Sequence, residues 1–109
     1  MTQLPDVIAR YHDAHDQRDV ETALASFEPN GIVRDDGHEY HGLDEIRDWL
    51  SRASTKFTYT RTLTGADNPD ANKWLVTNHL ERNFPGGVVD LRYRFVVADG
   101  LISELEIGP

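Results

Sequence analysis

The sequence predicts an α+β domain in which helices precede strands. Three segments with helical spacing of apolar residues fill the first half of the chain, and four segments that alternate apolar and polar residues follow them. This order favours one curved antiparallel sheet wrapped around the helices. With 109 residues, the chain is expected to form a single domain over residues 1–109.

The three helical segments are bounded by residues that begin or end a helix. The first covers residues 4–15, where apolar side chains recur at i, i+3, i+4 and i+7 and Pro5 suits the first turn. Asp19 is the expected N-cap of the second, residues 20–28, which the tripeptide Pro-Asn-Gly ends. The third covers residues 43–53 and buries one apolar stripe.

Turn sequences separate the four predicted long strands. GADNPDA, PGG and DG are hairpin signals, so the strands are expected to form an antiparallel meander. Alternation predicts that the odd-numbered residues of the third strand and the even-numbered residues of the second point inward. The strands cover residues 56–64, 73–84, 88–98 and 101–107.

Composition argues against several classes of function. Asp and Glu outnumber Lys and Arg by 19 to 11, and no basic stripe interleaved with aromatic residues points to nucleic acid. The lack of cysteine removes disulfides, thiolate nucleophiles and cysteine metal sites. No apolar run approaches the length of a membrane span, and no signal peptide is evident. We therefore expect a cytoplasmic protein without membrane or nucleic-acid partners.

The stretch RDDGHEY, residues 34–40, is expected to form a short hairpin before the third helix. Asp36-Gly37 is sufficient for the turn. The preceding carboxylate, Asp35, shares a strand face with Val33 and would point inward, where desolvation makes a carboxylate more basic. Asp35 is the best candidate for chemistry, and the alternative is a structural role as an acceptor in the turn.

Four segments of the chain are similar to those of one known superfamily. They are RYHDAHDQRD, ALASFEPNGIVRDD, YHGLDEIRDWL and RFVVADGLISEL. In these segments and in its element order the chain resembles the nuclear transport factor 2-like superfamily, in its SnoaL-like and ketosteroid isomerase-like branch. The resemblance implies a cone-shaped, cystatin-like fold with a curved antiparallel sheet around three N-terminal helices. Because that fold hosts many functions, it does not by itself identify the chemistry.

The resemblance also implies roles for individual residues. Ketosteroid isomerases combine a carboxylate base with an oxyanion hole made by a tyrosine and a protonated aspartic acid. Asp35 stands at the position of the base and Tyr11 at that of the tyrosine. Tyr93 stands where the protonated acid is expected, whereas Asp90 lies on the opposite strand face. A Tyr11/Tyr93 pair facing Asp35 is a coherent variant, and the alternative for Tyr11 is a core aromatic residue.

Six further residues are expected to contact a substrate. His15 follows Tyr11 by one helical turn and could orient the phenol or relay a proton, or could cap the helix instead. Asn78 needs a ligand, a water or a side chain as partner among its apolar neighbours. The set of six is His15, Tyr59, Trp74, Val76, Asn78 and Phe95.

Metal ions and cofactors are not expected. The spacing of the histidines and carboxylates matches no established ligand pattern, whether in the hairpin or in the first helix: His12, Asp13, Asp16, His38 and His41. Asp90 and Arg92 share the outer face of the third strand, where a cross-strand ion pair explains them. That face is often a dimer surface in the superfamily, so a homodimer is expected.

Two functions remain open at this point. The first is a cofactor-free isomerase or cyclase that removes a proton next to the carbonyl group of a small apolar compound. The second is a module of the same fold that binds a small molecule, or a second copy of the chain, without chemistry. An Asp35 that is solvated or bound to the hairpin backbone would favour the second.

Overall fold

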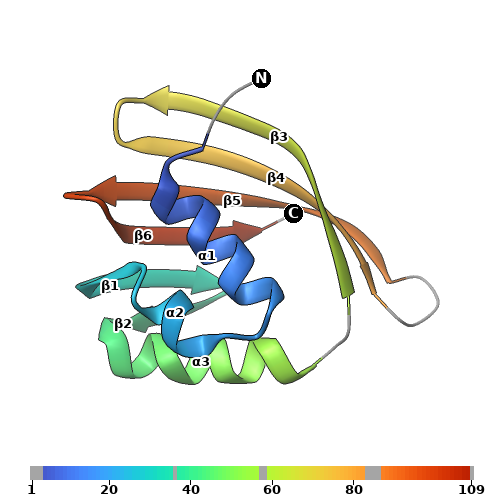
Figure 1. The fold of residues 1–109 in the computed structure, drawn as a ribbon, viewed down its shortest axis with the longest axis horizontal. Coiled ribbons are helices and arrows are strands. Elements are labelled where there is room, and N and C mark those ends of the chain that lie inside the picture. Colours follow the sequence, from blue (N-terminus) through green and yellow to red (C-terminus); the bar gives the residue numbers. More distant parts are fainter. Residues whose placement is uncertain (1–3, 36, 57–58, 83–86, 109) are drawn as a thin grey trace.

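Three helices cover one face of a curved six-stranded sheet (Figure 1). The computed structural model describes residues 4–35, 37–56, 59–82 and 87–108. None of the helices in these ranges is long and apolar enough to cross a membrane. In chain order the elements are α1 (Asp6–Asp16), α2 (Val20–Leu24), β1 (Phe27–Asp35), β2 (His38–His41), α3 (Gly42–Lys56), β3 (Tyr59–Asp70), β4 (Lys73–Arg82), β5 (Val88–Ala98) and β6 (Leu101–Gly108).

The order of the strands in the sheet is β2-β1-β6-β5-β4-β3. Neighbouring strands are antiparallel except for β1 and β6, which run parallel. The predicted meander is therefore confirmed as β3 to β6, and the predicted hairpin of β1 and β2 extends the sheet beyond β6. Because β2 and β3 form its two edges, the sheet stays open, and α1 crosses the face formed by β4, β5 and β6 (Figure 1).

The second helix is shorter than predicted because β1 begins early. Asp19 caps α2 as expected, since its Oδ1 accepts the Thr22 N–H at 3.2 Å. The helix nevertheless ends at Leu24, and Phe27 pairs with Ile102 of β6. The Pro-Asn-Gly segment thus lies inside β1, where the register shifts before β1 and β6 pair again. Local spacing could not reveal this, because the partner strand lies near the far end of the chain.

The expected bounds of the third helix and of the first two long strands are also partly wrong. Lys56 ends α3 instead of opening a strand. The strand β3 continues to Asp70, and its hairpin with β4 turns between Asp70 and Lys73. Two register shifts accommodate the glycine and proline of GADNPDA, which is possible because β3 is an edge strand. Asp36 of the predicted turn, and the expected strand residues 57, 58, 83 and 84, lie outside the described residues.

The predicted inner faces of the long strands are confirmed. On β5, Tyr93 and Phe95 are buried, whereas Arg92 and Arg94 are exposed. On β4, the even-numbered residues from 76 to 80 are buried. These side chains meet the apolar stripes of α1 and α3 in one core, whose largest fully buried apolar and aromatic side chains are Tyr11, Phe95, Ile8, Ile46, Leu50, Ile102 and Leu105.

The outer face of the sheet is covered by charged side chains of both signs. Asp90 is exposed and its Oδ1 lies 2.7 Å from Nδ1 of His79, its cross-strand partner. This hydrogen bond and the Asp90 charge raise the pKa of His79. The cross-strand ion pair predicted for Asp90 thus exists, and its partner is His79 of β4. The pairing of β4 with β5 is regular around Asp90, so no bulge turns it inward.

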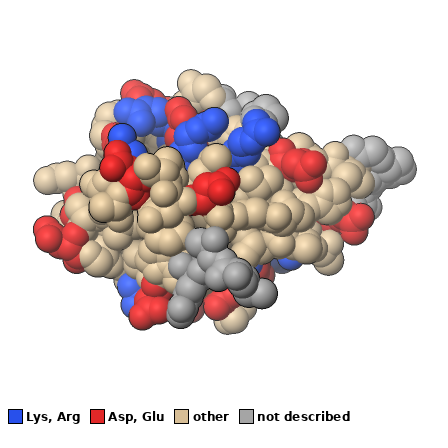
Figure 2. Space-filling view, turned by 90° about the horizontal axis from the view of Figure 1, so that it is seen from above, with Lys and Arg blue, Asp and Glu red and all other residues tan. Residues whose placement is uncertain are grey.

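The surface seen from the β3 side has the same mixed charge. Lys and Arg side chains gather along one margin of the molecule, and Asp and Glu lie among them (Figure 2). One such pair on the outer sheet face joins Arg94 of β5 to Glu106 of β6 at 3.7 Å. Exposed pairs of this kind contribute little to stability, so the sheet is held by its inner face.

The sheet core should be far more sensitive to truncation than the sheet edge. Leu105 on β6 is fully buried, whereas Leu63 on β3 is 46% exposed. We expect Leu105→Ala to lower the free energy of unfolding by about 2 to 5 kcal/mol, because it leaves a cavity. The matched control Leu63→Ala should lower it by less than about 1 kcal/mol. Urea unfolding measures both, and equal losses would contradict this assignment of the core.

Candidate functional site

Asp35 lies at the end of β1, and its carboxylate is oriented by a side chain of α3. The indole Nε1–H of Trp49 donates to Oδ2 of Asp35 at 3.0 Å. Trp49 is buried and Asp35 is half-buried. Among the residues that the structure describes, the indole is the only hydrogen-bond partner of this carboxylate, and no backbone N–H of residues 37–41 donates to it. An indole donates one hydrogen bond and accepts none, so it stabilises the charged carboxylate.

Two side chains of α1 continue from Trp49 toward the interior. The ring of His15 stacks on the indole of Trp49, with centroids 6.3 Å apart, and on the ring of Tyr11, with centroids 5.8 Å apart. The Tyr11 ring is fully buried and makes edge contacts with Phe27 and Phe95. Burial lowers the pKa of His15, against the opposing effect of nearby carboxylates that include Asp35. His15 is therefore a neutral ring beside Asp35 at pH 7.

Tyr93 faces the same side of the sheet as Asp35 but lies two strands away. Asp35 of β1 pairs with Ile107 of β6, which in turn pairs with Tyr93 of β5. Two strand spacings separate the Asp35 and Tyr93 backbones by roughly 10 Å. The buried Tyr93 ring lies 5.3 Å from the ring of His12, measured between centroids. Asp35 and Tyr93 can therefore face one small ligand from two sides, but not each other directly.

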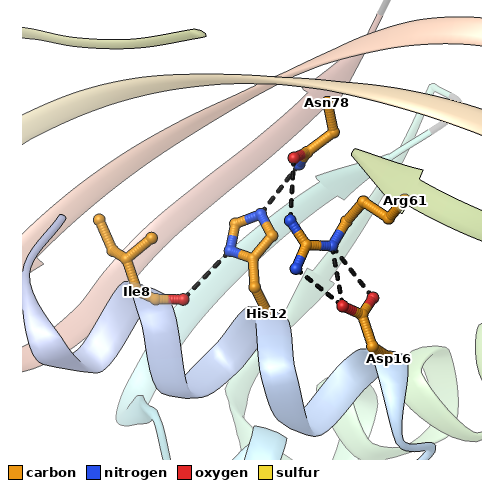
Figure 3. A network of polar contacts seen from close by, with 5 residues as sticks. All are labelled: Ile8, His12, Asp16, Arg61 and Asn78. Atoms are coloured by element: carbon orange, nitrogen blue, oxygen red, sulfur yellow. Dashed lines mark hydrogen bonds and ion pairs between the residues drawn. The ribbon is translucent and has the colours of Figure 1, made fainter. Parts of the chain in front are cut away.

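A chain of hydrogen bonds crosses the interior from α1 to the sheet (Figure 3). Nδ1 of His12 lies 3.1 Å from the Ile8 carbonyl oxygen, and Nε2 lies 2.9 Å from Nδ2 of Asn78. Nη1 of Arg61 donates to Oδ1 of Asn78 at 3.0 Å. The same guanidinium donates through Nε and Nη2 to the carboxylate of Asp16, with a shortest distance of 2.7 Å.

The donors in this network determine the protonation of His12. Because a guanidinium can only donate, Oδ1 of Asn78 must face Arg61, and Nδ2 must donate to Nε2 of His12. The proton of the neutral imidazole is then on Nδ1, where the Ile8 carbonyl accepts it. Burial, followed by the Arg61 charge, lowers the pKa of His12 to about 4. Asn78 thus has side chains as its partners, which is one of the three possibilities expected for it.

The structure brings together some of the predicted site residues more closely than others. Asp35, His15 and Tyr11 form one continuous group through Trp49. Val76 and Phe95 are fully buried beside the His12 network, and Trp74 is half-buried against the edge of the same core. The side chain of Tyr59 lies outside what the structure describes. Roles for these residues toward a substrate stay predictions.

Four residues of the site were not predicted from the sequence. Trp49 was assigned only to the apolar stripe of the third helix, and Arg61 to a strand. His12 and Asp16 were considered only as metal ligands. The i, i+4 spacing of His12 and Asp16 was a usable signal for a polar stripe beside the apolar one. No local signal pairs them with Arg61, which is 45 positions from Asp16. Within the described residues, no three carboxylate or histidine side chains are grouped so as to hold a metal ion.

Comparison with known proteins identifies the family. The profile of the SnoaL-like domain matches residues 8–105, which is nearly the whole chain. A candidate polyketide cyclase from Sinorhizobium meliloti is 32% identical, with 96% of this chain and 95% of that chain covered and a TM-score of 0.88. The chain belongs to the SnoaL-like domain family. Its fold is the predicted cone of the nuclear transport factor 2-like superfamily.

More distant structures share the fold of this SnoaL-like protein. A protein from Catenulispora acidiphila with a ketosteroid isomerase-like fold, in complex with trimethylamine, is 14% identical; 98% of this chain and 87% of that chain are covered, with a TM-score of 0.85. SalBIII is an epoxide hydrolase/cyclase-like enzyme with a role in pyran ring formation in salinomycin, and it is 16% identical. The match covers 94% of this chain and 86% of that chain, with a TM-score of 0.80. No curated protein matches the sequence.

The His12 network should make this SnoaL-like protein sensitive to mild acid. The pKa of His12 is about 4 in the folded chain, against 6.5 for an ordinary histidine. Between these values the unfolded chain binds more protons, so the free energy of unfolding should fall as the pH drops from 6.5 to 4. The loss due to His12 is up to about 3 kcal/mol.

The variant His12→Gln tests this origin of the pH dependence. The amide oxygen of the glutamine can accept the hydrogen bond from Asn78 but cannot be protonated. We therefore expect the free energy of unfolding of the variant to depend less on pH below 6.5. We also expect it to be lower than that of wild type at pH 7. Urea unfolding at pH 7, 5.5 and 4.5 measures both. His41→Gln, at an exposed position, should keep the wild-type dependence. A His12→Gln curve parallel to that of wild type would contradict the assignment.

Proposed function

We propose that this SnoaL-like protein is a cofactor-free enzyme of the isomerase or cyclase type. Asp35 removes a proton from the carbon next to a carbonyl group, and the resulting enolate then rearranges or closes a ring. The substrate is a small apolar carbonyl compound that lies between Asp35 and the inner face of the sheet. The observation that carries this proposal is the half-buried Asp35 carboxylate, held through one oxygen by the Trp49 indole.

The environment of Asp35 suits a general base. The bond from the indole reaches Oδ2 alone, which orients the carboxylate and leaves Oδ1 for a substrate proton. Partial burial limits competition from water, which would otherwise solvate the charge. The position at the end of a central strand, packed against a helix, keeps the base rigid.

Three neighbours of Asp35 supply the remaining roles in this proposal. Tyr11 and Tyr93 donate O–H groups to the oxygen of the enolate, where negative charge develops. His15 is neutral because burial lowers its pKa, so it can position the Tyr11 ring on which it stacks without adding a charge. Neither the removal of the proton by Asp35 nor the stabilisation of the enolate by the tyrosines needs a metal ion or an organic cofactor in this proposal.

Similar proteins support chemistry of this class. The relative from Sinorhizobium meliloti is a candidate polyketide cyclase, and its match covers nearly the whole of both chains. SalBIII, which shares the fold, is an epoxide hydrolase/cyclase-like enzyme. Ring closure and isomerisation both begin with a proton moved at a defined carbon or oxygen, which a single oriented carboxylate can do.

The variant Asp35→Asn tests the role of the base. We expect the wild type to accelerate the exchange of α-hydrogens of cyclohexanone and ethyl acetoacetate in D2O, followed by ¹H NMR. Asp35→Asn should slow the catalysed exchange by roughly 10² to 10⁴-fold, because an amide cannot accept the proton. The control Asp90→Asn, on the outer face, should exchange at the wild-type rate. Binding of these ketones without exchange would identify a non-catalytic binding module instead.

Trp49 should act as a positioning residue for Asp35. Trp49→Phe keeps an aromatic ring in the core but removes the N–H that binds Oδ2. A hydrogen bond to a charged group contributes roughly 1.5 to 3 kcal/mol, so kcat for α-hydrogen exchange should fall about 10- to 100-fold. KM should change little, because the indole N–H does not contact the ketone in this proposal. A change in KM with kcat unchanged would show that Trp49 shapes the binding site instead of orienting the base.

A further inference from the structure

His38 is the direct cross-strand neighbour of Asp35. The two residues face each other in the register of β1 with β2, at the end of the hairpin. Residues directly opposite on antiparallel strands share one face and have Cβ atoms about 5 Å apart. The imidazole of His38 is exposed, whereas the carboxylate of Asp35 is half-buried. A titratable ring thus stands between the candidate base and water.

An open groove of about 340 Å³ adjoins His38. It lies between β2 and α3. Tyr40 forms part of its wall, and the centroid of that ring lies 6.2 Å from that of Trp49. The Trp49 ring therefore contacts both the ring of His15 in the interior and the ring of Tyr40 in the wall of the groove. The groove is lined by His38, Glu39, Tyr40, Glu45, Asp48 and Arg52.

The chemistry of a carboxylate base creates a need that His38 can meet. A base that has taken a proton must release it before the next turnover. The Trp49 indole N–H cannot accept that proton, because it is only a donor. Burial lowers the pKa of His15, which makes His15 a poor acceptor as well. An exposed imidazole both accepts and releases protons near neutral pH.

We propose that His38 is the group through which Asp35 exchanges its proton with water. In this step, which rests on the proposed function, the O–H bond of the Asp35 carboxylic acid breaks and an N–H bond forms on the imidazole. The products are the carboxylate and an imidazolium. The imidazolium then transfers its proton to a water molecule in the groove, which regenerates the neutral ring.

The charges around His38 are compatible with a transient imidazolium. Asp35 faces it from β1, and Glu45, Asp48 and Arg52 line the groove with it from α3. Arg52 lies over the Tyr40 ring, with its guanidinium carbon 5.6 Å from the centroid. The carboxylates that line the groove outnumber its single guanidinium, so the surrounding charges do not oppose a transient positive charge on the ring.

Imidazole rescue tests the proposal by a readout that a structural role would not change. In D2O, His38→Ala should slow deuterium incorporation into cyclohexanone by about tenfold or more, and added imidazole should restore the rate in proportion to its concentration. His41→Ala, on the opposite face of β2, should behave as wild type with and without imidazole. A wild-type rate in His38→Ala, or a loss that imidazole does not restore, would overturn the proposal.

A second measurement needs no substrate and separates this proposal from the proposed function. The carboxyl-carbon NMR resonance of Asp35 should show a second step at the pH where the His38 ring titrates. His38→Gln should remove that step and His41→Gln should keep it. Absence of the step in wild type would overturn the link between the two residues. A clear step in a protein that exchanges no ketone would support the link while the enzymatic proposal fails.

Discussion

The architecture of the site depends on how α1 is attached to the sheet. An imidazole and a carboxamide are buried here in an otherwise apolar core, which is costly unless every polar atom has a partner. His12 and Asn78 satisfy each other, and Arg61 with Asp16 completes the chain at its partly exposed end. These bonds form only when α1 lies in one register across β3 and β4. The network therefore specifies the position of the helix in a way that interchangeable apolar contacts would not.

The position of α1 in turn determines the candidate site. Two stripes run along this helix at i, i+4 spacing: His12 and Asp16 point to the network, while Tyr11 and His15 point to Trp49. A shift or rotation of the helix would move both stripes together. The stability of the fold and the geometry of the candidate site are coupled in this way, because the side chains that anchor the helix are immediate neighbours of those beside Asp35.

His12 in the core and His79 on the outer face of the sheet lie in opposite electrostatic environments. Burial and the Arg61 charge keep His12 neutral, so it serves as a fixed acceptor. On the outer face, a carboxylate favours the charged form of His79. Asp35 is half-buried and bound by a single neutral donor, the Trp49 indole. A base of the kind proposed needs such partial exposure, because it has to take up a proton and release it again.

The sequence by itself determined the order of the helices and strands, the inner faces of the long strands and the place of Asp35 at the end of a strand, because these follow from local periodicity and turn chemistry. It placed Asp35, Tyr11 and His15 on faces that the structure shows to converge. Only the tertiary structure decided that Trp49 binds Asp35, that Arg61 joins Asp16 to Asn78, and that β1 pairs in parallel with β6. Each of these joins residues far apart in the chain. No periodicity encodes such pairings; they arise when buried polar groups must find partners in the folded chain.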